Sequence, residues 1–178
     1  VGQNRMKPAI AVFIDSRDPA NLSHNRRNSQ FVCNYQYFEF VTEELVNTID
    51  SEYKTSPNAE DRVILGLSLG GLNSACFGLL ASETFAGIAM QSPYTVPVPN
   101  LIGYYEKSEK LPLKFFISTG ARNDGRRQTR VLQKALQKKG YPIKYREVSG
   151  SHDWYNWKPL LDDILVYYFP QEKLTDKP

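Results

Sequence analysis

Apolar and polar positions alternate along the chain with two different periods, one typical of strands and one of helices. Short apolar runs predict strands at residues 9–14, 63–67, 87–90, 114–119 and 143–148. Apolar residues at helical spacing predict helices at residues 37–53, 72–80 and 154–168, and a further helix that ends at Gly140. Strands separated by helices favour an α/β fold with a mainly parallel sheet and helices on both faces.

A short strand that leads into a G-x-S-x-G turn is the most informative local pattern. Gly66, Ser68 and Gly70 form this turn, directly before a helical pattern. A serine in this context occupies a strained strand-to-helix turn and projects its hydroxyl group from the sheet. The backbone N–H of Leu69 would then face an oxygen that develops negative charge. We therefore predict Ser68 as a nucleophile, the alternative being a glycine-rich turn without chemistry.

A histidine after the serine is the next group that such chemistry needs, because the hydroxyl must lose its proton. Of the two histidines, His24 precedes Ser68 in a polar stretch, whereas His152 follows it. His152 lies on a short loop between the strand at 143–148 and the last predicted helix. This location predicts His152 as the general base. The alternative is a structural or solvated histidine.

A carboxylate that orients the histidine is expected between the two, in the order Ser, acid, His. Asp124 fits this order and lies on the loop after the strand at 114–119. There it could accept a hydrogen bond from the imidazole and set its tautomer. The alternative is that Asp124 caps the following helix. Asp153 is the rival acid, ranked second because adjacent side chains usually diverge.

Together these segments resemble the putative esterase family of α/β-hydrolases, which includes the enterochelin-type siderophore esterases and the feruloyl and acetyl-xylan esterases. The resemblance rests on Ser68 in GLSLGGL, on the Asp124 loop, and on the SGSHDWYNWK segment around His152. The segment from Arg27 to Asn34 is similar to the R-x-x-E-L-x-x-N pattern of the siderophore-esterase branch. It departs from that pattern at Gln30, where the branch usually has Glu.

The resemblance also implies roles for residues outside the expected triad. It places the oxyanion hole at the N–H of Leu69 and at the loop around Asp15. Substrate-binding positions are expected at Arg27, Tyr94 and Trp154, although an arginine in a polar loop often lies on the surface and one of the two tryptophans is expected in the core. The acid loop varies in the family, so a Ser–His pair without Asp124 stays an alternative.

Length and composition fit a single catalytic domain over residues 1–178. The chain is 41% hydrophobic and 23% charged, with a formal net charge of +3. By comparison with the family, the first strands of the sheet are missing, and an exposed sheet edge would favour a homo-oligomer. No apolar run is long enough to span a membrane. A cluster of arginines around the acid loop lacks the interleaved aromatics of a nucleic-acid site, so a solvated basic face is expected.

The sequence implies no cofactor, and two distant histidines and two distant cysteines predict no metal site. Cys33 and Cys76 predict no disulfide framework, and Cys76 is expected as a small buried apolar residue. The predicted function is a serine esterase that acts on a siderophore-type, feruloyl or acetyl-polysaccharide ester. The alternatives are an acyltransferase on the same fold and a hydrolase-fold binding module without catalysis.

Overall fold

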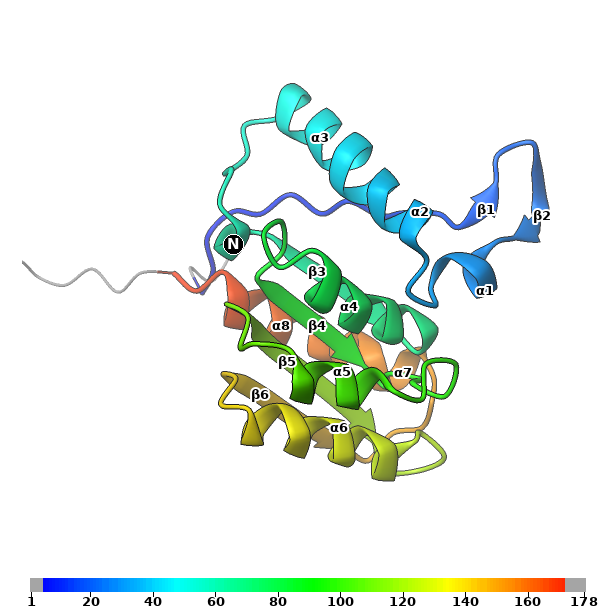
Figure 1. The fold of residues 1–178 in the computed structure, drawn as a ribbon, viewed down its shortest axis with the longest axis vertical. Helices are drawn as coiled ribbons and strands as arrows, with labels where there is room; N and C mark the ends of the chain where they lie inside the picture. Colours follow the sequence, from blue (N-terminus) through cyan, green and yellow to red (C-terminus); the bar gives the residue numbers. More distant parts are fainter. Residues whose placement is uncertain (1–4, 172–178) are drawn as a thin grey trace, which may run out of the picture.

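A four-stranded parallel sheet forms the centre of the computed structural model, which describes residues 5–171 (Figure 1). Its strands, in spatial order, are β3 (Val63–Leu67), β4 (Gly87–Gln91), β5 (Lys114–Gly120) and β6 (Ile143–Val148). Neighbouring strands are paired in parallel without a break in register. All four strands therefore end at the same edge of the sheet, where open α/β sheets place their sites.

Helices cover both faces of this sheet, which confirms the predicted arrangement (Figure 1). On one face lie α4 (Leu69–Leu80), α5 (Leu101–Lys107) and α6 (Arg126–Lys138). On the other lie α7 (Trp154–Trp157), the 3₁₀ turn η3 (Lys158–Leu160) and α8 (Leu161–Tyr168). The side chains of β5 alternate between the two layers, as a strand requires. Phe115 and Ile117 pack in the larger core cluster, while Phe116 packs against Ile164 and Tyr168.

One long helical segment lies beside α4 and agrees with the helix predicted at residues 37–53. It consists of α2 (Tyr35–Glu39), the π-helical η1 (Phe40–Leu45) and α3 (Val46–Glu52). The side chain of Asn34 caps its start by accepting a hydrogen bond from the Tyr37 backbone N–H. The rings of Tyr37 and Phe38 contact Phe77 on α4, so this helix extends the larger core cluster.

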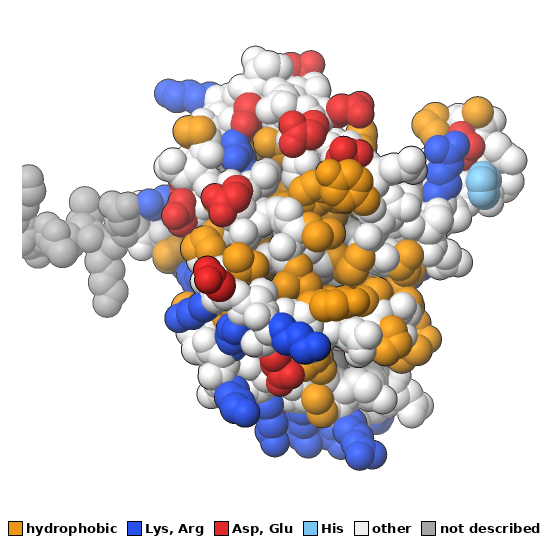
Figure 2. All heavy atoms as spheres, viewed as in Figure 1, with side chains coloured by type: hydrophobic (Ala, Val, Ile, Leu, Met, Phe, Trp, Pro, Cys, Tyr) orange, Lys and Arg blue, Asp and Glu red, His pale blue; other side chains and the backbone are white. Residues whose placement is uncertain are grey.

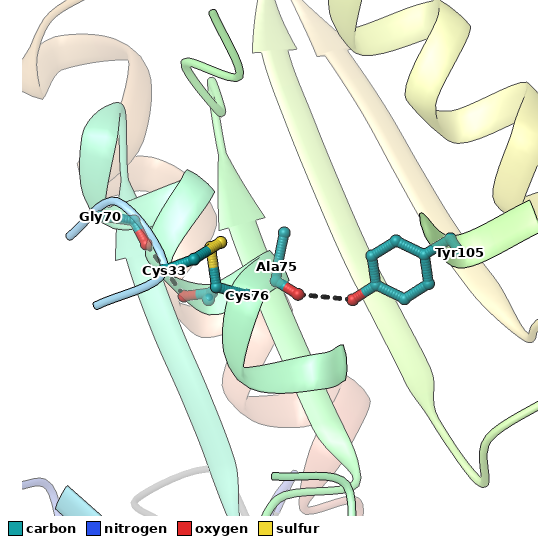
Figure 3. The surroundings of a disulfide bond; sticks show 6 residues. Cys33, Gly70, Ala75, Cys76 and Tyr105 are labelled. Carbon is teal, nitrogen blue, oxygen red and sulfur yellow. Dashed lines mark hydrogen bonds between the residues drawn. A yellow bond between two sulfur atoms is a disulfide. The ribbon is translucent and has the colours of Figure 1, made fainter. Parts of the chain in front are cut away.

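A disulfide between Cys33 and Cys76 joins the start of this helical segment to α4 (Figure 3). The expectation that the cysteines form no framework was therefore wrong. Cys76 is buried, as expected, but as half of a bond that spans 43 residues of sequence. Sequence spacing alone cannot show that two cysteines meet, because the pairing depends on how the long helix packs on α4.

The strand predicted at residues 9–14 does not form. This segment has no strand partner among the described residues, and the Phe13 side chain is 93% exposed. A segment becomes a strand only when its backbone pairs with a neighbouring strand. Within residues 5–171, residues 9–14 pair with no strand, and the outer edge of β3 is also left unpaired. The loop predicted after it contains a small hairpin and one helical turn, namely β1 (Arg17–Asp18), β2 (Asn21–Asn25) and α1 (Arg27–Gln30).

Two further differences concern helices. The helix α5 was not predicted, because only Leu101 and Tyr105 mark its buried face. The helix predicted at 154–168 is divided by η3, where Pro159 supplies no backbone N–H donor for a continuous helix. The short η2 turn (Ala59–Asp61) precedes β3. Among residues 5–171, no helix has both the length and the apolar character needed to cross a membrane.

Candidate active site

Ser68 lies between the end of β3 and the start of α4, at the predicted strand-to-helix turn. Its backbone has φ 57° and ψ −117°, a conformation that residues other than glycine rarely adopt. The turn brings the strand and helix so close that a Cβ atom on Gly66 would lie 1.9 Å from the Gly70 carbonyl oxygen. Glycine is therefore required at position 66. This strained backbone conformation projects the Ser68 side chain above the sheet edge.

The structure brings Ser68, His152 and Asp124 together from three separate loops. The Oγ atom of Ser68 lies 2.8 Å from Nε2 of His152, and Nδ1 of His152 lies 2.5 Å from Oδ1 of Asp124. The carboxyl group of Asp124 is fully buried, whereas the His152 side chain is 37% exposed. An N–H at Nδ1 that donates to the carboxylate leaves the Nε2 lone pair to accept the Ser68 hydroxyl proton. This arrangement has the hydrogen-bond order of a nucleophile, a general base and an orienting acid.

The two aspartates that the sequence left as alternatives have different partners. Asp124 does not cap α6, because Gly125 occupies the N-cap position. Asp153 instead caps α7, where its carboxylate accepts a hydrogen bond from the Asn156 backbone N–H at 3.1 Å. The carboxylate of Asp153 therefore serves a backbone donor, and that of Asp124 serves His152.

Other groups around the carboxylate of Asp124 were not predicted. Its Oδ2 atom accepts hydrogen bonds from Ser92 Oγ at 2.6 Å, from Asn156 Nδ2 at 3.0 Å and from the Gly120 backbone N–H. Ser92 directly follows β4, so its position at the same sheet edge was the one available signal. Asn156 carries no such signal, because its orientation depends on how α7 packs behind the acid loop.

A cavity of about 490 Å³ opens beside the Ser68 hydroxyl group. Its lining contains three of the predicted site residues besides Ser68 and His152, namely Leu69, Arg27 and Tyr94. Leu69 is the first residue of α4, where a backbone N–H has no acceptor within the helix. The backbone N–H of Tyr94 donates to the Ser68 carbonyl oxygen at 3.0 Å, which places Tyr94 beside the Ser68 turn. Sequence reasoning missed the remaining wall, formed by Asn28, Val32 and Pro97.

Two predicted site residues lie elsewhere. Neither Asp15 nor Trp154 is among the described residues that line this cavity. The carboxylate of Asp15 forms an ion pair with Arg17, and these hydrogen bonds lower the pKa of Asp15 to about 2. Trp154 is half exposed at the start of α7. A role for the backbone near Asp15 as the second oxyanion donor stays a prediction.

Basic side chains gather along α6 at one end of the molecule, and acidic ones gather near α3 at the other (Figure 2). Within the arginine cluster around the acid loop, Arg130 pairs with Glu147 on β6. The hydrogen bonds from Arg130 lower the pKa of Glu147 to about 2. Both side chains are partly exposed to solvent. Arg130 is therefore already paired within the protein.

The model of the putative esterase family matches residues 1–113. The chain belongs to the putative esterase family. One relative is YjcH of Bacillus subtilis strain 168, which is described as uncharacterized. It is 29% identical over 140 residues, which are 72% of this chain and 58% of YjcH.

The iron(III) enterobactin esterase of Escherichia coli K12 is a second relative of this chain. It is 28% identical over 175 residues, which cover 92% of this chain and 42% of the relative. The chain thus spans about half the length of the curated relatives it matches. A solved enterobactin esterase from Shigella flexneri gives a TM-score of 0.80 at 25% identity, covering 94% of this chain and 45% of that protein.

More distant solved structures have the same fold. An S-formylglutathione hydrolase from Staphylococcus aureus gives a TM-score of 0.66 at 17% identity, covering 80% of this chain and 63% of that protein. A ferulic acid esterase gives a TM-score of 0.67 at 19% identity, covering 75% and 60%. The parallel sheet, its two helical layers and these similarities establish an α/β-hydrolase fold.

Proposed function

We propose that this chain hydrolyses carboxylic esters through an acyl-enzyme formed on Ser68. The observation that carries the proposal is the continuous contact from Ser68 Oγ through His152 to the buried Asp124 carboxylate, at 2.8 and 2.5 Å. Membership of the putative esterase family supports ester hydrolysis as the reaction class.

In the proposed reaction, His152 accepts the hydroxyl proton while Ser68 Oγ attacks the ester carbonyl carbon. The carbonyl oxygen becomes an oxyanion, which the Leu69 N–H stabilises. One donor of this kind contributes about 3 kcal/mol to transition-state stabilisation in serine hydrolases. His152 then returns the proton to the leaving alcohol, and water releases the acid by the same steps in reverse order. The negative charge of Asp124 stabilises the imidazolium that forms in each half-reaction.

We propose a siderophore-type ester as the substrate, and feruloyl or acetyl-polysaccharide esters as the alternative substrate class. The enterobactin esterases that match most of this chain support the first class. The cavity beside Ser68 has the size of a small-molecule site. Arg27 has no ion-pair partner among the described residues, so its guanidinium group at the cavity wall is free for an anionic or phenolic oxygen. Tyr94 provides an aromatic surface beside it.

The proposal is tested by comparing the wild-type protein with Ser68→Ala on a short aryl ester. We expect Ser68→Ala to fold normally and to lose nearly all turnover. Ser74→Ala is a matched control, because Ser74 is a buried serine on α4 whose hydroxyl donates to a helix carbonyl. Turnover retained in Ser68→Ala would contradict the proposal. Wild-type protein that is inactive on every ester would favour the binding-module alternative.

A panel of trilactone siderophore, feruloyl and acetyl-xylan esters tests the substrate class. We expect the highest kcat/KM on the siderophore ester, and Arg27→Ala should raise KM for it more than for a neutral aryl acetate. A sugar acceptor added to each reaction tests the acyltransferase alternative. An acylated sugar product in place of the free acid would assign the chain to acyl transfer.

A further inference from the structure

Two side chains that take no part in the proposed reaction form a hydrogen-bonded chain to the buried carboxylate of Asp124. The Nε1 atom of Trp157 lies 2.8 Å from Ser92 Oγ, which in turn lies 2.6 Å from Asp124 Oδ2. Ser92 is 2% exposed. The three residues come from the end of β4, the acid loop and α7, so their contact is a product of the tertiary fold.

The proton positions in this chain follow from the chemistry of its groups. An indole N–H only donates, so Ser92 Oγ accepts from Trp157. The single hydroxyl proton of Ser92 is then directed to Asp124 Oδ2. Asn156 Nδ2 and the Gly120 N–H also donate to this oxygen. Thr119 Oγ1 also lies 3.3 Å from Oδ2. These contacts all engage Oδ2, so Oδ1 is left to accept from His152.

The backbone at Ser92 indicates that the direction of its side chain is imposed. Its φ is 49°, in the left-handed region that disfavours residues with a side chain. The Ser92 N–H donates to the Ser118 carbonyl oxygen at 2.8 Å, which anchors the residue to β5. Strained conformations of this kind persist where the surrounding structure requires them, and they cluster at functional sites.

Trp157 also contacts the base directly. Its ring meets that of His152 edge to face, with centroids 5.0 Å apart and an angle of 86° between the ring planes. The Gln91 side-chain amide donates to the Trp157 carbonyl oxygen at 3.0 Å and holds this residue against the end of β4. Trp157 therefore restrains the imidazole ring on one side and, through Ser92, the carboxylate on the other.

We propose that Ser92 and Trp157 are positioning residues that hold Asp124 as an oriented acceptor and thereby fix the tautomer and orientation of His152. This inference rests on the proposed function of Ser68. In this arrangement neither residue touches the substrate. Their loss should therefore reduce the rate of the chemical step and leave substrate binding unchanged.

Two variants separate the hydrogen bonds from the packing. Ser92→Ala removes the hydroxyl donor to Asp124, and Trp157→Phe removes the indole N–H together with the five-membered ring while keeping an aromatic ring next to His152. We expect Ser92→Ala to lower kcat by about tenfold or more, the effect of losing a hydrogen bond to a charged group. Trp157→Phe should lower kcat less, and KM should stay within about twofold in both.

Ser118→Ala is the matched control, because Ser118 is fully buried at the neighbouring strand end and its hydroxyl has no hydrogen-bond partner among the described residues. It should leave kcat and KM unchanged. Proton NMR supplies a second measurement that needs no substrate. The Nδ1 proton of His152 should resonate far downfield in the wild-type protein and disappear in His152→Ala. We expect it to shift or broaden in Ser92→Ala and Trp157→Phe, but not in Ser118→Ala.

Folding of each variant is checked by circular dichroism, and if Ser92→Ala does not fold, Trp157→Phe alone decides. An unchanged Nδ1 resonance together with kcat within twofold of wild type would overturn the proposal. So would a rise in KM with constant kcat. A wild-type protein without esterase activity would contradict the proposed function. In that event the NMR comparison still tests whether Ser92 and Trp157 hold the His152–Asp124 pair.

Discussion

At the scale of single residues, Asp124 and Asp153 both lie next to His152, the first in space and the second in sequence, but they have different hydrogen-bond partners. The Asp124 carboxylate is buried and contacts His152 Nδ1, while that of Asp153 accepts from the backbone at the start of α7. A negative charge is useful at the first position, since it stabilises an imidazolium ion. At the second position only a hydrogen-bond acceptor is needed.

The first prediction is that Asp124→Asn lowers turnover far more than Asp153→Asn. An amide at position 124 can donate to Nδ1 and so favour the wrong tautomer, which costs about 10⁴ in turnover in a Ser-His-Asp triad. Asn is as good an N-cap as Asp, so Asp153→Asn should retain both activity and stability. Steady-state kinetics on an aryl ester would show the difference. Nearly full activity in Asp124→Asn would indicate a Ser–His pair without an acid.

The proximity of the three residues of the expected triad was predictable because each lies on a turn or loop that follows a strand, and parallel strands bring their ends to one edge. Ser92 also follows a strand, but a serine at that position has no sequence pattern that distinguishes it from a loop residue. Its role depends on Trp157, 65 residues later, whose indole reaches it only after α7 has packed. Asp15 was placed by family resemblance alone, and no hydrogen bond or cavity contact joins its side chain to the site among the described residues.

At the scale of elements, the disulfide between Cys33 and Cys76 connects two parts of the site. Cys33 directly follows Val32 in the cavity wall, and Arg27 lies one short helix earlier. Cys76 lies on α4, the helix that begins after Ser68. The bond therefore joins one wall of the cavity to the helix that begins directly after Ser68 (Figure 3).

We therefore predict that the double variant Cys33→Ser, Cys76→Ala loses stability and binds substrate more weakly. The chain-entropy estimate for a loop of this length is about 4 kcal/mol, and measured losses are typically about 2–4 kcal/mol. KM should rise because the wall is less well held, whereas kcat should change less. Urea unfolding and steady-state kinetics measure both effects. Dithiothreitol should reproduce them in the wild type and leave the double variant unaffected; equal unfolding free energies would contradict the prediction.

Strong apolar periodicity made the main helices and strands predictable. The errors occurred where the apolar pattern was weak or where the structure depended on a partner elsewhere in the fold. The apolar residues of β4 and β5 are buried in the sheet of the structure, as their patterns indicated, whereas those of β3, at the sheet edge, are only partly buried or, like Leu65, exposed. The same type of apolar run at residues 9–14 remains unpaired, because pairing depends on a neighbour and not on composition. In the last helical segment, Pro159 is visible in the sequence, but the apolar spacing continues across it.

At the scale of the whole molecule, β3 forms one outer edge of the four-stranded sheet. Within the described part of the chain no strand pairs with it, and the nearby apolar segment leaves Ile10, Val12 and Phe13 exposed. Unpaired strand edges and exposed apolar groups favour pairing between chains. We propose a second copy of this chain as the partner at this edge.

The corresponding prediction is concentration-dependent association that Phe13→Lys weakens. Tyr155→Lys is the matched control, because Tyr155 on α7 is 92% exposed, almost the same as Phe13, and lies away from this edge. Sedimentation velocity at several concentrations would measure the association. A monomer at all concentrations, or equal effects of the two substitutions, would exclude this edge as the contact.

The edge-to-face contact between Trp157 and His152 also gives the molecule an internal optical signal. The chain contains two tryptophans, and W154F would leave the indole beside His152 as the only one. A protonated imidazole quenches the fluorescence of an adjacent indole more strongly than a neutral one. The emission of that single fluorophore should therefore follow the charge on the base in real time, in the resting protein and while an acyl group occupies Ser68.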